Sequence, residues 1–244
     1  MIVLVDLGNS RLKWAVLQSN GQLGTMRAVA HEHARISSLR AGVPVLAVSV
    51  AKESVRSRFE SMVRKATGFA PHFVQSETQH GALINGYRDA WRLGADRWVA
   101  MIGARALFPR ASALLVVDVG TATTLDLVTR DGRHHGGLIL PGPVMMVESL
   151  LGQTGGIARR ARGVRQAAQA DFFVRDTRSA VRQGATQSVV SMIERARREA
   201  RAAIGSNPTV ILTGGGAGDI EADLAVAHRR VDDLVLQGLA QYAK

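Results

Sequence analysis

The sequence predicts a duplicated α/β fold with two similar halves and a cleft between them. An apolar strand, an Asp-x-Gly turn and a second strand occur in order around Asp6, and the same order recurs around Asp118. Asp118 follows Asp6 by 112 residues, which is close to half of the 244-residue chain. Hydrophobic residues make up 46% of the chain, enough for a sizeable core and too many for a disordered protein. A chance match between two short motifs is the alternative to duplication.

The first half has the pattern of a strand meander followed by helices. Residues 2–6 and 12–17 are apolar strands that flank the polar turn Gly8-Asn9-Ser10-Arg11. Further strands are expected at 25–30, 45–50 and 73–74, and helices at 53–67 and 94–108. The segment 75–93 is mixed and polar, so we expect a loop there.

The second half begins with the repeated motif and ends in helices. Strands are expected at 114–118, 124–129, 137–140 and 210–213, and helices at 144–151, 185–204 and 232–242. Asp232 or Asp233 is the expected cap of the last helix. Residues 152–170 are rich in Gly, Arg and Ala, so a mobile loop is expected within them. The restart of the pattern divides the chain into expected lobes at 1–110 and 111–244.

Composition excludes several classes of protein. The chain contains no cysteine, which excludes disulfides, thiolate metal sites and cysteine nucleophiles. No uncharged run in the chain reaches the about 20 apolar residues that a membrane-spanning helix needs. The first residues, MIVLVD, lack the basic leader of a signal peptide. We therefore expect a soluble, cytoplasmic protein with no membrane partner.

The net charge of +11 indicates a surface that attracts anions. Residues 151–205 contain 11 Arg against four acidic residues, a local net charge of +7. This region has no interleaved aromatic residues and no nucleic-acid-binding motif. A solvated helix face or a field for small anions is favoured over a nucleic-acid site.

The two Asp-x-Gly motifs are candidate phosphate-binding loops. Glycine lets a phosphate approach the backbone, whose N–H groups can bind it, and Asn9, Ser10, Arg11 and Lys13 add side-chain donors. Mg²⁺ prefers a few carboxylates together with water and phosphate oxygens, which suits an aspartate at a strand end. A single motif of this kind is equally explained by a turn that satisfies its own backbone. No P-loop and no Rossmann fingerprint occurs in the sequence.

Two further segments are candidates for binding or catalysis. The run from Thr213 to Gly218 leaves backbone free of side chains, which would admit a flat adenine or ribose, or only a close strand-to-helix crossing. In Gly94-Ala-Asp-Arg-Trp98, Asp96 is either a carboxylate base beside the anion-binding Arg97 or a helix N-cap. Tyr87 would add a hydroxyl group or a stacking face. The histidines, including the pairs His31/His33 and His134/His135, are expected at the surface.

Four ordered motifs make the chain resemble the type III pantothenate kinases. They begin at Asp6 (DLGNSRLKW), Gly94 (GADRW), Asp118 (DVGTATT) and Gly136 (GGLILPG), and together they span most of the chain. That family belongs to the acetate and sugar kinase/actin superfamily. The resemblance implies a duplicated actin-like/ribonuclease H-like fold, with two lobes around a nucleotide cleft. It also implies phosphorylation of pantothenate by ATP, the first step of coenzyme A biosynthesis.

The resemblance implies a role for each matching residue. Asp96 would accept the proton of the pantothenate hydroxyl, Asp6 would bind Mg²⁺ through water, and Asp118 would bind a monovalent cation, K⁺ or NH₄⁺. The residues implied for ATP are Asp6, Leu7, Gly8, Asn9, Ser10, Arg11, Leu12, Lys13 and Thr121, and those implied for pantothenate are Tyr87, Gly94, Ala95, Asp96, Arg97 and Thr177.

The resemblance further implies a homodimer, with the substrate pocket near the dimer interface. Two positions depart from the family pattern, because Ser10 stands where Thr is commoner and Asp176 stands where Asn is usual. Some short members of the family are tied to the regulation of transcription. The alternative function is therefore a non-enzymatic regulator that uses the basic region 151–205.

Overall fold

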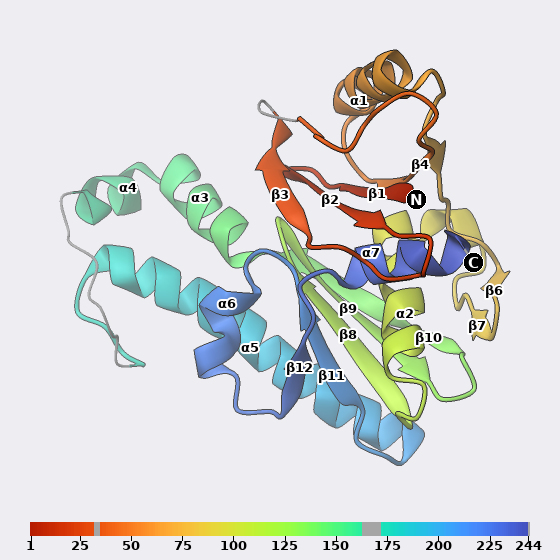
Figure 1. The fold of residues 1–244 in the computed structure, drawn as a ribbon. Coiled ribbons are helices and arrows are strands. Elements are labelled where there is room, and N and C mark those ends of the chain that lie inside the picture. Colours follow the sequence, from red (N-terminus) through yellow and green to blue (C-terminus); the bar gives the residue numbers. More distant parts are fainter. Residues whose placement is uncertain (32–34, 163–171, 244) are drawn as a thin grey trace. The chain divides into compact units, whose positions relative to one another are not determined.

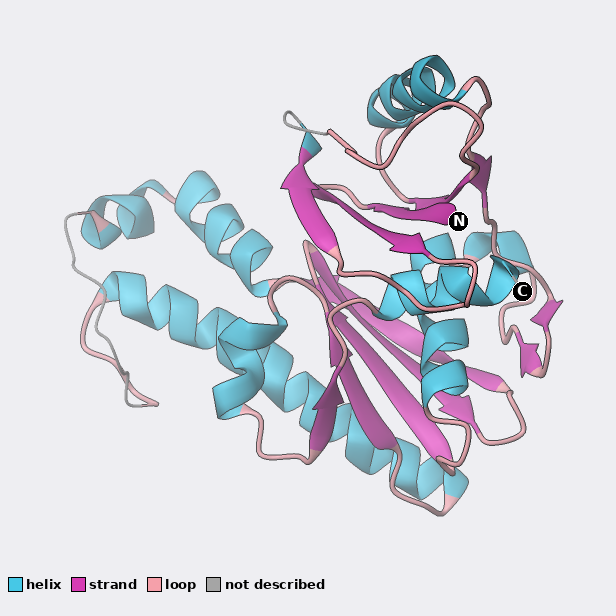
Figure 2. Ribbon diagram, in the orientation of Figure 1, coloured by secondary structure: helices cyan, strands magenta, loops and turns pink. Residues whose placement is uncertain are grey.

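The computed structural model describes residues 1–31, 35–162 and 172–243, whose strands form two five-stranded sheets and one hairpin (Figures 1 and 2). In the first sheet, β1 is antiparallel to β2 and parallel to β4. Val3, Leu4 and Val5 of β1 are fully buried, as expected of a central strand that is covered on both faces. The strand order is β3-β2-β1-β4-β5, formed by β1 (Ile2–Leu7), β2 (Arg11–Leu17), β3 (Arg27–Ala30), β4 (Val45–Ser49) and β5 (His72–Phe73).

The second sheet repeats the arrangement of the first. Its order is β10-β9-β8-β11-β12, formed by β8 (Ala113–Val119), β9 (Ala122–Thr129), β10 (His134–Pro141), β11 (Thr209–Thr213) and β12 (His228–Arg230). In both sheets the third, second, first, fourth and fifth strands along the chain follow one another. The repeat expected from the two Asp-x-Gly motifs is therefore present in the topology.

Helices and short turns connect these strands. The helices are α1 (Glu53–Thr67), α2 (Ala95–Leu107), α3 (Pro143–Gln153), α4 (Gly155–Ala161), α5 (Thr177–Ile204), α6 (Ala217–Ile220) and α7 (Leu234–Leu239). Short 3₁₀ turns follow at η2 (Ala90–Arg92), η3 (Glu221–Asp223) and η4 (Ala240–Ala243), and the hairpin consists of β6 (Gln79–His80) and β7 (Leu83–Ile84). No helix in the described part of the chain is long and apolar enough to cross a membrane.

The chain forms two compact units, and the first contains Met1–Leu114, Asp126–Gly136 and Asp233–Lys244. One part of its core lies between the first sheet and α1, where Val5, Leu12, Phe59 and Val63 are buried together. Another part is the crossing of α2 and α7, which lie side by side in Figure 1. A side chain at Gly238 would overlap the carbonyl oxygen of Val99, so glycine allows the two helices to approach closely.

The second unit contains Leu115–Leu125 and Gly137–Asp232. Its core is formed by strands β8, β9 and β11 and one side of α5, with Val117, Leu125, Val189, Ile193 and Leu212 buried together. Each unit consists of separate segments of the chain, so no single boundary in the sequence divides one unit from the other. The expected lobe boundary between residues 110 and 111 stays a prediction.

Several elements differ from those predicted. Helix α5 begins at Thr177 rather than at 185, because the Asp176 carboxylate accepts a hydrogen bond from the backbone N of Ser179 (2.8 Å) and caps the helix. The segment 152–170 includes the helix α4 in its described part, and residues 163–171 lie outside the described residues. The expected loop 75–93 contains the hairpin β6–β7 and the turn η2, and β12 was not predicted.

Candidate active site

The first phosphate-loop candidate connects β1 to β2. Asp6 lies near the end of β1, is 9% exposed, and pairs in register with Lys13 of β2. The backbone N of Gly8 donates to the carbonyl oxygen of Arg11 (3.1 Å), which closes a tight turn. Asn9, Ser10 and Arg11 are exposed and so present polar groups to solvent. The loop therefore combines a buried carboxylate with exposed donors, a chemistry that suits a phosphate and its Mg²⁺.

Two leucine side chains anchor the β1–β2 loop to the core. The side chains of Leu7 and Leu12 are buried in the core of the first unit. Leu7 and Leu12 could therefore bind a nucleotide only through their backbone groups. Their buried side chains fix the position of the turn. His31 adds a further restraint, because its Nε2 lies 2.9 Å from the carbonyl oxygen of Gly8.

The second loop connects β8 to β9 and repeats this geometry. The backbone N of Gly120 donates to the carbonyl oxygen of Ala122 (3.0 Å), as Gly8 does in the first loop. Thr121 at the tip is exposed, and its carbonyl oxygen accepts a hydrogen bond from the backbone N of Gly142 (2.9 Å). Thr121, implied for ATP, therefore lies on the turn that follows β8, and Asp118, implied for a cation, lies near the end of that strand.

The surroundings of Asp118 contain oxygen atoms close to a glycine. Gly214 has a φ of +97°, and a side chain there would overlap the carboxylate of Asp118 and the backbone of Val119. The first Gly of the Thr213–Gly218 run is thus required by a left-handed backbone and a close approach. Carboxylate and carbonyl oxygens are the ligands that a hard cation prefers. The donor set at Asp118 fits the monovalent cation that the resemblance implies.

Asp96 lies in the first turn of α2. Its Oδ1 accepts a hydrogen bond from the backbone N of Arg97 (2.8 Å), and a β-carbon at Gly94 would lie only 2.7 Å from Oδ1. The N-cap position belongs to Gly94, so the alternative in which Asp96 is itself the N-cap is wrong. Burial raises the pKa of the Asp96 carboxyl, against the lowering effect of the backbone hydrogen bond and the charge of Arg97. A carboxylate with a raised pKa is suited to accept a proton.

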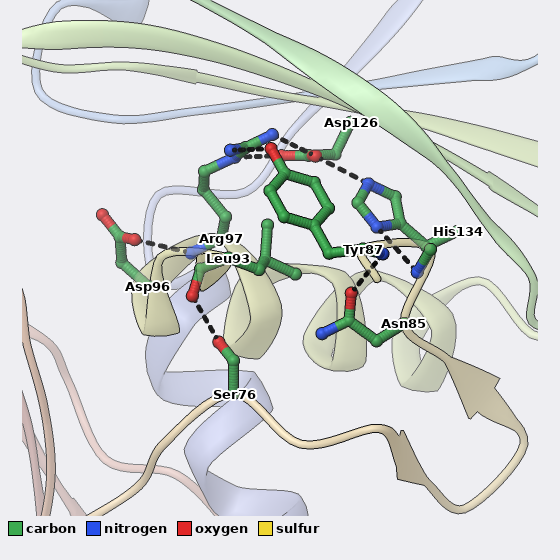
Figure 3. Close-up of polar contacts among 9 residues, drawn as sticks. Ser76, Asn85, Tyr87, Leu93, Asp96, Arg97, Asp126 and His134 are labelled. Atoms are coloured by element: carbon green, nitrogen blue, oxygen red, sulfur yellow. Dashed lines mark hydrogen bonds and ion pairs between the residues drawn. The ribbon is translucent and has the colours of Figure 1, made fainter. Parts of the chain in front are cut away.

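Arg97 is buried, and its guanidinium makes polar contacts with two residues (Figure 3). Its Nε donates to Asp126 Oδ2 (2.9 Å) and its Nη2 donates to Asp126 Oδ1 (2.6 Å), which is a bidentate ion pair. Its Nη1 donates to the hydroxyl oxygen of Tyr87 (3.1 Å). These bonds raise the pKa of Arg97 against the opposing effect of burial. The guanidinium is therefore held in place before any substrate binds.

His134 completes the cluster, and its position corrects a prediction. It was expected at the surface but is 2% exposed, with Nε2 2.9 Å from Asp126 Oδ1. The backbone N of Gly86 donates to His134 Nδ1 (3.4 Å), and the rings of Tyr87 and His134 stack with centroids 5.9 Å apart. His135, the next residue, is exposed as expected, whereas His33 lies outside the described residues.

Asp126 and His134 were not among the residues predicted for the site. The available signal was the charged residue Asp126 between the two leucines of the strand Thr-Thr-Leu-Asp-Leu-Val-Thr, and the structure shows that Asp126 is buried. A carboxylate inside a sheet needs a cationic or donor partner, so the pattern predicts a buried pair without identifying Arg97. The partner lies 29 residues earlier, on α2.

The structure places the residues implied for pantothenate in different units. Tyr87, Gly94, Ala95, Asp96 and Arg97 are close together in the first unit. Thr177 begins α5 in the second unit, where it lines a cavity of about 430 Å³ between α3, α4 and α5. Asp176, the departure from the family pattern, caps that helix.

The family profile described as type III pantothenate kinase matches residues 2–199. The protein is 35% identical to a type III pantothenate kinase of Aromatoleum aromaticum, over 100% of this chain and 98% of the relative. It is also 35% identical to a type III pantothenate kinase of Methylibium petroleiphilum, over 99% of this chain and 98% of the relative. The chain belongs to the type III pantothenate kinase family.

Solved structures show the same fold at low sequence identity. A protein of Campylobacter jejuni named as a Baf family transcriptional activator has a TM-score of 0.60 at 18% identity, covering 98% of this chain and 96% of its own. A protein of Sinorhizobium meliloti named as a 2-dehydro-3-deoxygalactonokinase has a TM-score of 0.56 at 17% identity, covering 100% of this chain and 98% of its own. The predicted fold class, a duplicated actin-like α/β fold, is confirmed.

Proposed function

We propose that this type III pantothenate kinase family member transfers the γ-phosphoryl group of ATP to the primary hydroxyl group of pantothenate. The product is 4′-phosphopantothenate, formed in the first step of coenzyme A biosynthesis. The observation that carries the proposal is Asp96, a carboxylate whose pKa is raised by burial and which lies in the motif shared with the family. Full-length identity to enzymes of this name supports the choice of substrate.

Asp96 would accept the hydroxyl proton as the new P–O bond forms. Phosphoryl transfer depends on positioning and charge neutralisation more than on covalent catalysis. A base hydrogen-bonded to the attacking hydroxyl group gives its proton a place to go, which contributes about 10²–10⁴ in rate. Arg97 follows Asp96 in α2 and donates to the Tyr87 hydroxyl group, and both side chains would contact the substrate. Gly94 and Ala95 would bring the backbone to it.

The first loop would bind the ATP phosphates with a bound Mg²⁺ ion neutralising their charge. Asp6 to Lys13 would form this site, with side-chain donors from Asn9, Ser10, Arg11 and Lys13 and backbone groups from Leu7, Gly8 and Leu12. Thr121 would bind the phosphates from the second loop. Asp6 would contact Mg²⁺ through water, as suits an ion that keeps much of its hydration shell.

Asp118 would bind K⁺ or NH₄⁺ next to the phosphates. The support for this step is the Asp118 carboxylate itself, a hard oxygen ligand near the end of β8 that lies close to the turn at Gly214. The exposed hydroxyl-bearing residue Thr121 lies on the turn that follows β8.

A homodimer is the second part of the proposal. The face of the second unit at β10 and α3 exposes apolar side chains, among them Ile139 (64% exposed) and Val144 (58% exposed). Helix α3 has no buried residue in the single chain, although it is largely apolar. A second copy of the chain would cover this face. The pocket at Thr177, which α3 and α5 also line, would then lie close to the interface.

The regulatory alternative has weaker support. The similarity to the protein named as a transcriptional activator is 18% identity and shows the fold alone. The basic region 151–205 is partly helical and includes residues outside the described part of the chain. Binding of nucleic acid is not part of the proposal, and the expected cytoplasmic location stays a prediction.

A coupled assay of ADP formation tests the proposed function. The protein is mixed with ATP, Mg²⁺ and K⁺, with and without pantothenate. We expect ADP formation that depends on pantothenate. Absence of turnover, together with DNA binding that weakens steeply as salt rises, would favour the regulatory alternative.

A further inference from the structure

Asp126 is a buried carboxylate in the first unit that bonds to Arg97, the residue next to the candidate base Asp96. It lies on β9, is 2% exposed, and accepts hydrogen bonds from Arg97 on α2 and from His134 on β10. Figure 3 shows Asp126 between the guanidinium and the imidazole. None of the roles proposed above uses Asp126 or His134.

The hydrogen bonds determine which nitrogen of His134 carries the proton. The backbone N of Gly86 donates to Nδ1, so Nδ1 is the acceptor and Nε2 carries the proton that is donated to Asp126. Arg97 and Asp126 are opposite charges joined by a bidentate pair, and His134 adds a further hydrogen bond to that carboxylate. A side chain at Gly86 would overlap the carbonyl oxygen of His134, so the segment that carries Tyr87 is docked directly against this histidine.

We propose that Asp126 and His134 are positioning residues, which hold the Arg97 guanidinium away from Asp96 and fix Tyr87 against that guanidinium. This inference rests on the proposed function, in which Asp96 is the base and Tyr87 and Arg97 contact pantothenate. Asp126 engages Nε and Nη2 of Arg97, and the Tyr87 hydroxyl engages Nη1. The stacked His134 ring fixes the plane of the Tyr87 ring, with 9° between the two planes.

The need for such a restraint follows from the adjacency of Asp96 and Arg97. An arginine that paired with the base would stabilise its ionised form and weaken it as a proton acceptor. Asp96 instead accepts from the backbone N of Arg97, and its carboxylate lies apart from the guanidinium (Figure 3). The charged groups acting on Asp96 are Arg97, which lowers its pKa, and Asp126, which raises it. Behind them, His134 faces Asp126 and the Tyr87 hydroxyl faces Arg97.

Two amide substitutions at His134 separate positioning from packing. In His134→Gln the amide nitrogen can occupy the place of Nε2 and still donate to Asp126, whereas in His134→Asn the shorter amide lies nearer to Nδ1 and loses that bond. Both variants are polar and similar in size. His135→Asn on the same strand is the matched control, because His135 is exposed.

The measurements are steady-state kinetics, calorimetric titration with pantothenate, and thermal unfolding of each variant. We expect His134→Asn to lower kcat/KM for pantothenate by about 10²-fold, the scale of a small misplacement of catalytic groups, and to weaken pantothenate binding. We expect KM for ATP to change little, His134→Gln to recover most of the loss, and His135→Asn to match wild type. If the role of His134 were purely structural, both substitutions would lower the unfolding temperature, and His134→Gln would not recover the activity that His134→Asn loses.

A second variant, Asp126→Asn, tests the electrostatic part of the inference. It keeps the side-chain shape but leaves the charge of Arg97 uncompensated beside Asp96, so the pKa of Asp96 falls. Because the base must be ionised, the acid limb of the kcat/KM profile should move to lower pH. If His134→Asn does not fold, Asp126→Asn still tests whether this cluster acts on Asp96.

Failure of the inference can be distinguished from failure of the proposed function. An active wild-type enzyme with equal activity in folded His134→Asn and His134→Gln would overturn the inference alone. An unmoved acid limb in Asp126→Asn would overturn its electrostatic part. A wild-type protein that does not phosphorylate pantothenate would overturn the proposed function, and this inference with it.

Discussion

The Arg97 guanidinium forms hydrogen bonds with Asp126 and Tyr87, and the family resemblance also implies that it contacts pantothenate. The side chain is 6% exposed and forms a bidentate pair with Asp126. Arg97→Ala therefore leaves a buried carboxylate without its charge partner, and we expect a loss of about 3–5 kcal/mol in the free energy of unfolding. The same change removes a proposed pantothenate contact and should raise KM for pantothenate. Urea denaturation and steady-state kinetics measure the two effects.

Arg92→Ala is the control for that substitution. Arg92 pairs with Asp89, but both side chains are more than half exposed. We expect Arg92→Ala to lower the free energy of unfolding by at most about 1 kcal/mol, because exposed ion pairs contribute little to stability. Equal losses in the two variants would contradict the structural account of Arg97.

A second residue-scale prediction concerns Asp118. Replacing Asp118 with Asn keeps the shape of the side chain and removes its charge from the proposed cation site beside Gly214. We expect weaker activation of the kinase by K⁺, with little change in the unfolding temperature. A K⁺ titration of activity checks this, and a variant with unchanged activation and full turnover would show that Asp118 is structural.

At the scale of elements, the turn after β11 sets the environment of the second loop. Gly214 has positive φ and no room for a β-carbon, whereas a β-carbon at Gly215 would meet no atom within 4 Å. We expect Gly214→Ala to lower the free energy of unfolding by at least about 1–3 kcal/mol, the cost of a strained backbone position alone, because the overlap with Asp118 and Val119 adds to it. Gly215→Ala should be close to neutral. If urea denaturation gave the two variants the same stability, the account of this turn would be wrong.

The elements show how far sequence patterns reach. Apolar runs and the two Asp-x-Gly motifs were sufficient to predict the central strands β1, β2, β8 and β9, because burial and turn chemistry are local signals. The start of α5 was missed because its first turns are polar, and its cap at Asp176 was considered only as a departure from the family pattern. The two-residue strands β6 and β7 were missed because such short pairs carry no periodicity.

The same distinction applies to the site. The motif around Asp96 could be found from neighbouring letters, but the Arg97–Asp126–His134 cluster joins residues from one helix and two strands. His134 and His135 have the same polar neighbours in sequence, and only the alternation of a strand buries one and exposes the other. Sequence alone gives no signal for which of the two faces the core.

At the scale of the whole molecule, the proposed dimer makes a testable prediction. We expect light scattering at micromolar concentration to give twice the 26.1 kDa chain mass. Ile139→Glu should shift the protein toward the monomer, because it places a charge in the exposed apolar face of the second unit. Phe69→Glu is the control, since Phe69 is equally exposed (64%) but belongs to the first unit. A wild-type monomer would refute the dimer.

The most direct test of the central claim is the rate of 4′-phosphopantothenate formation by wild type, Asp96→Asn and Asp96→Ser, measured across pH. If Asp96 is the base, both variants should lose about 10²–10⁴ in turnover with ATP binding little changed. The wild-type acid limb should lie above the ordinary aspartate range near pH 4, because the pKa of Asp96 is raised and the base must be ionised. Serine can still accept a hydrogen bond from a free N–H of the first turn, so it preserves any role in stabilising the helix. A stable Asp96→Ser enzyme with wild-type turnover would contradict the account.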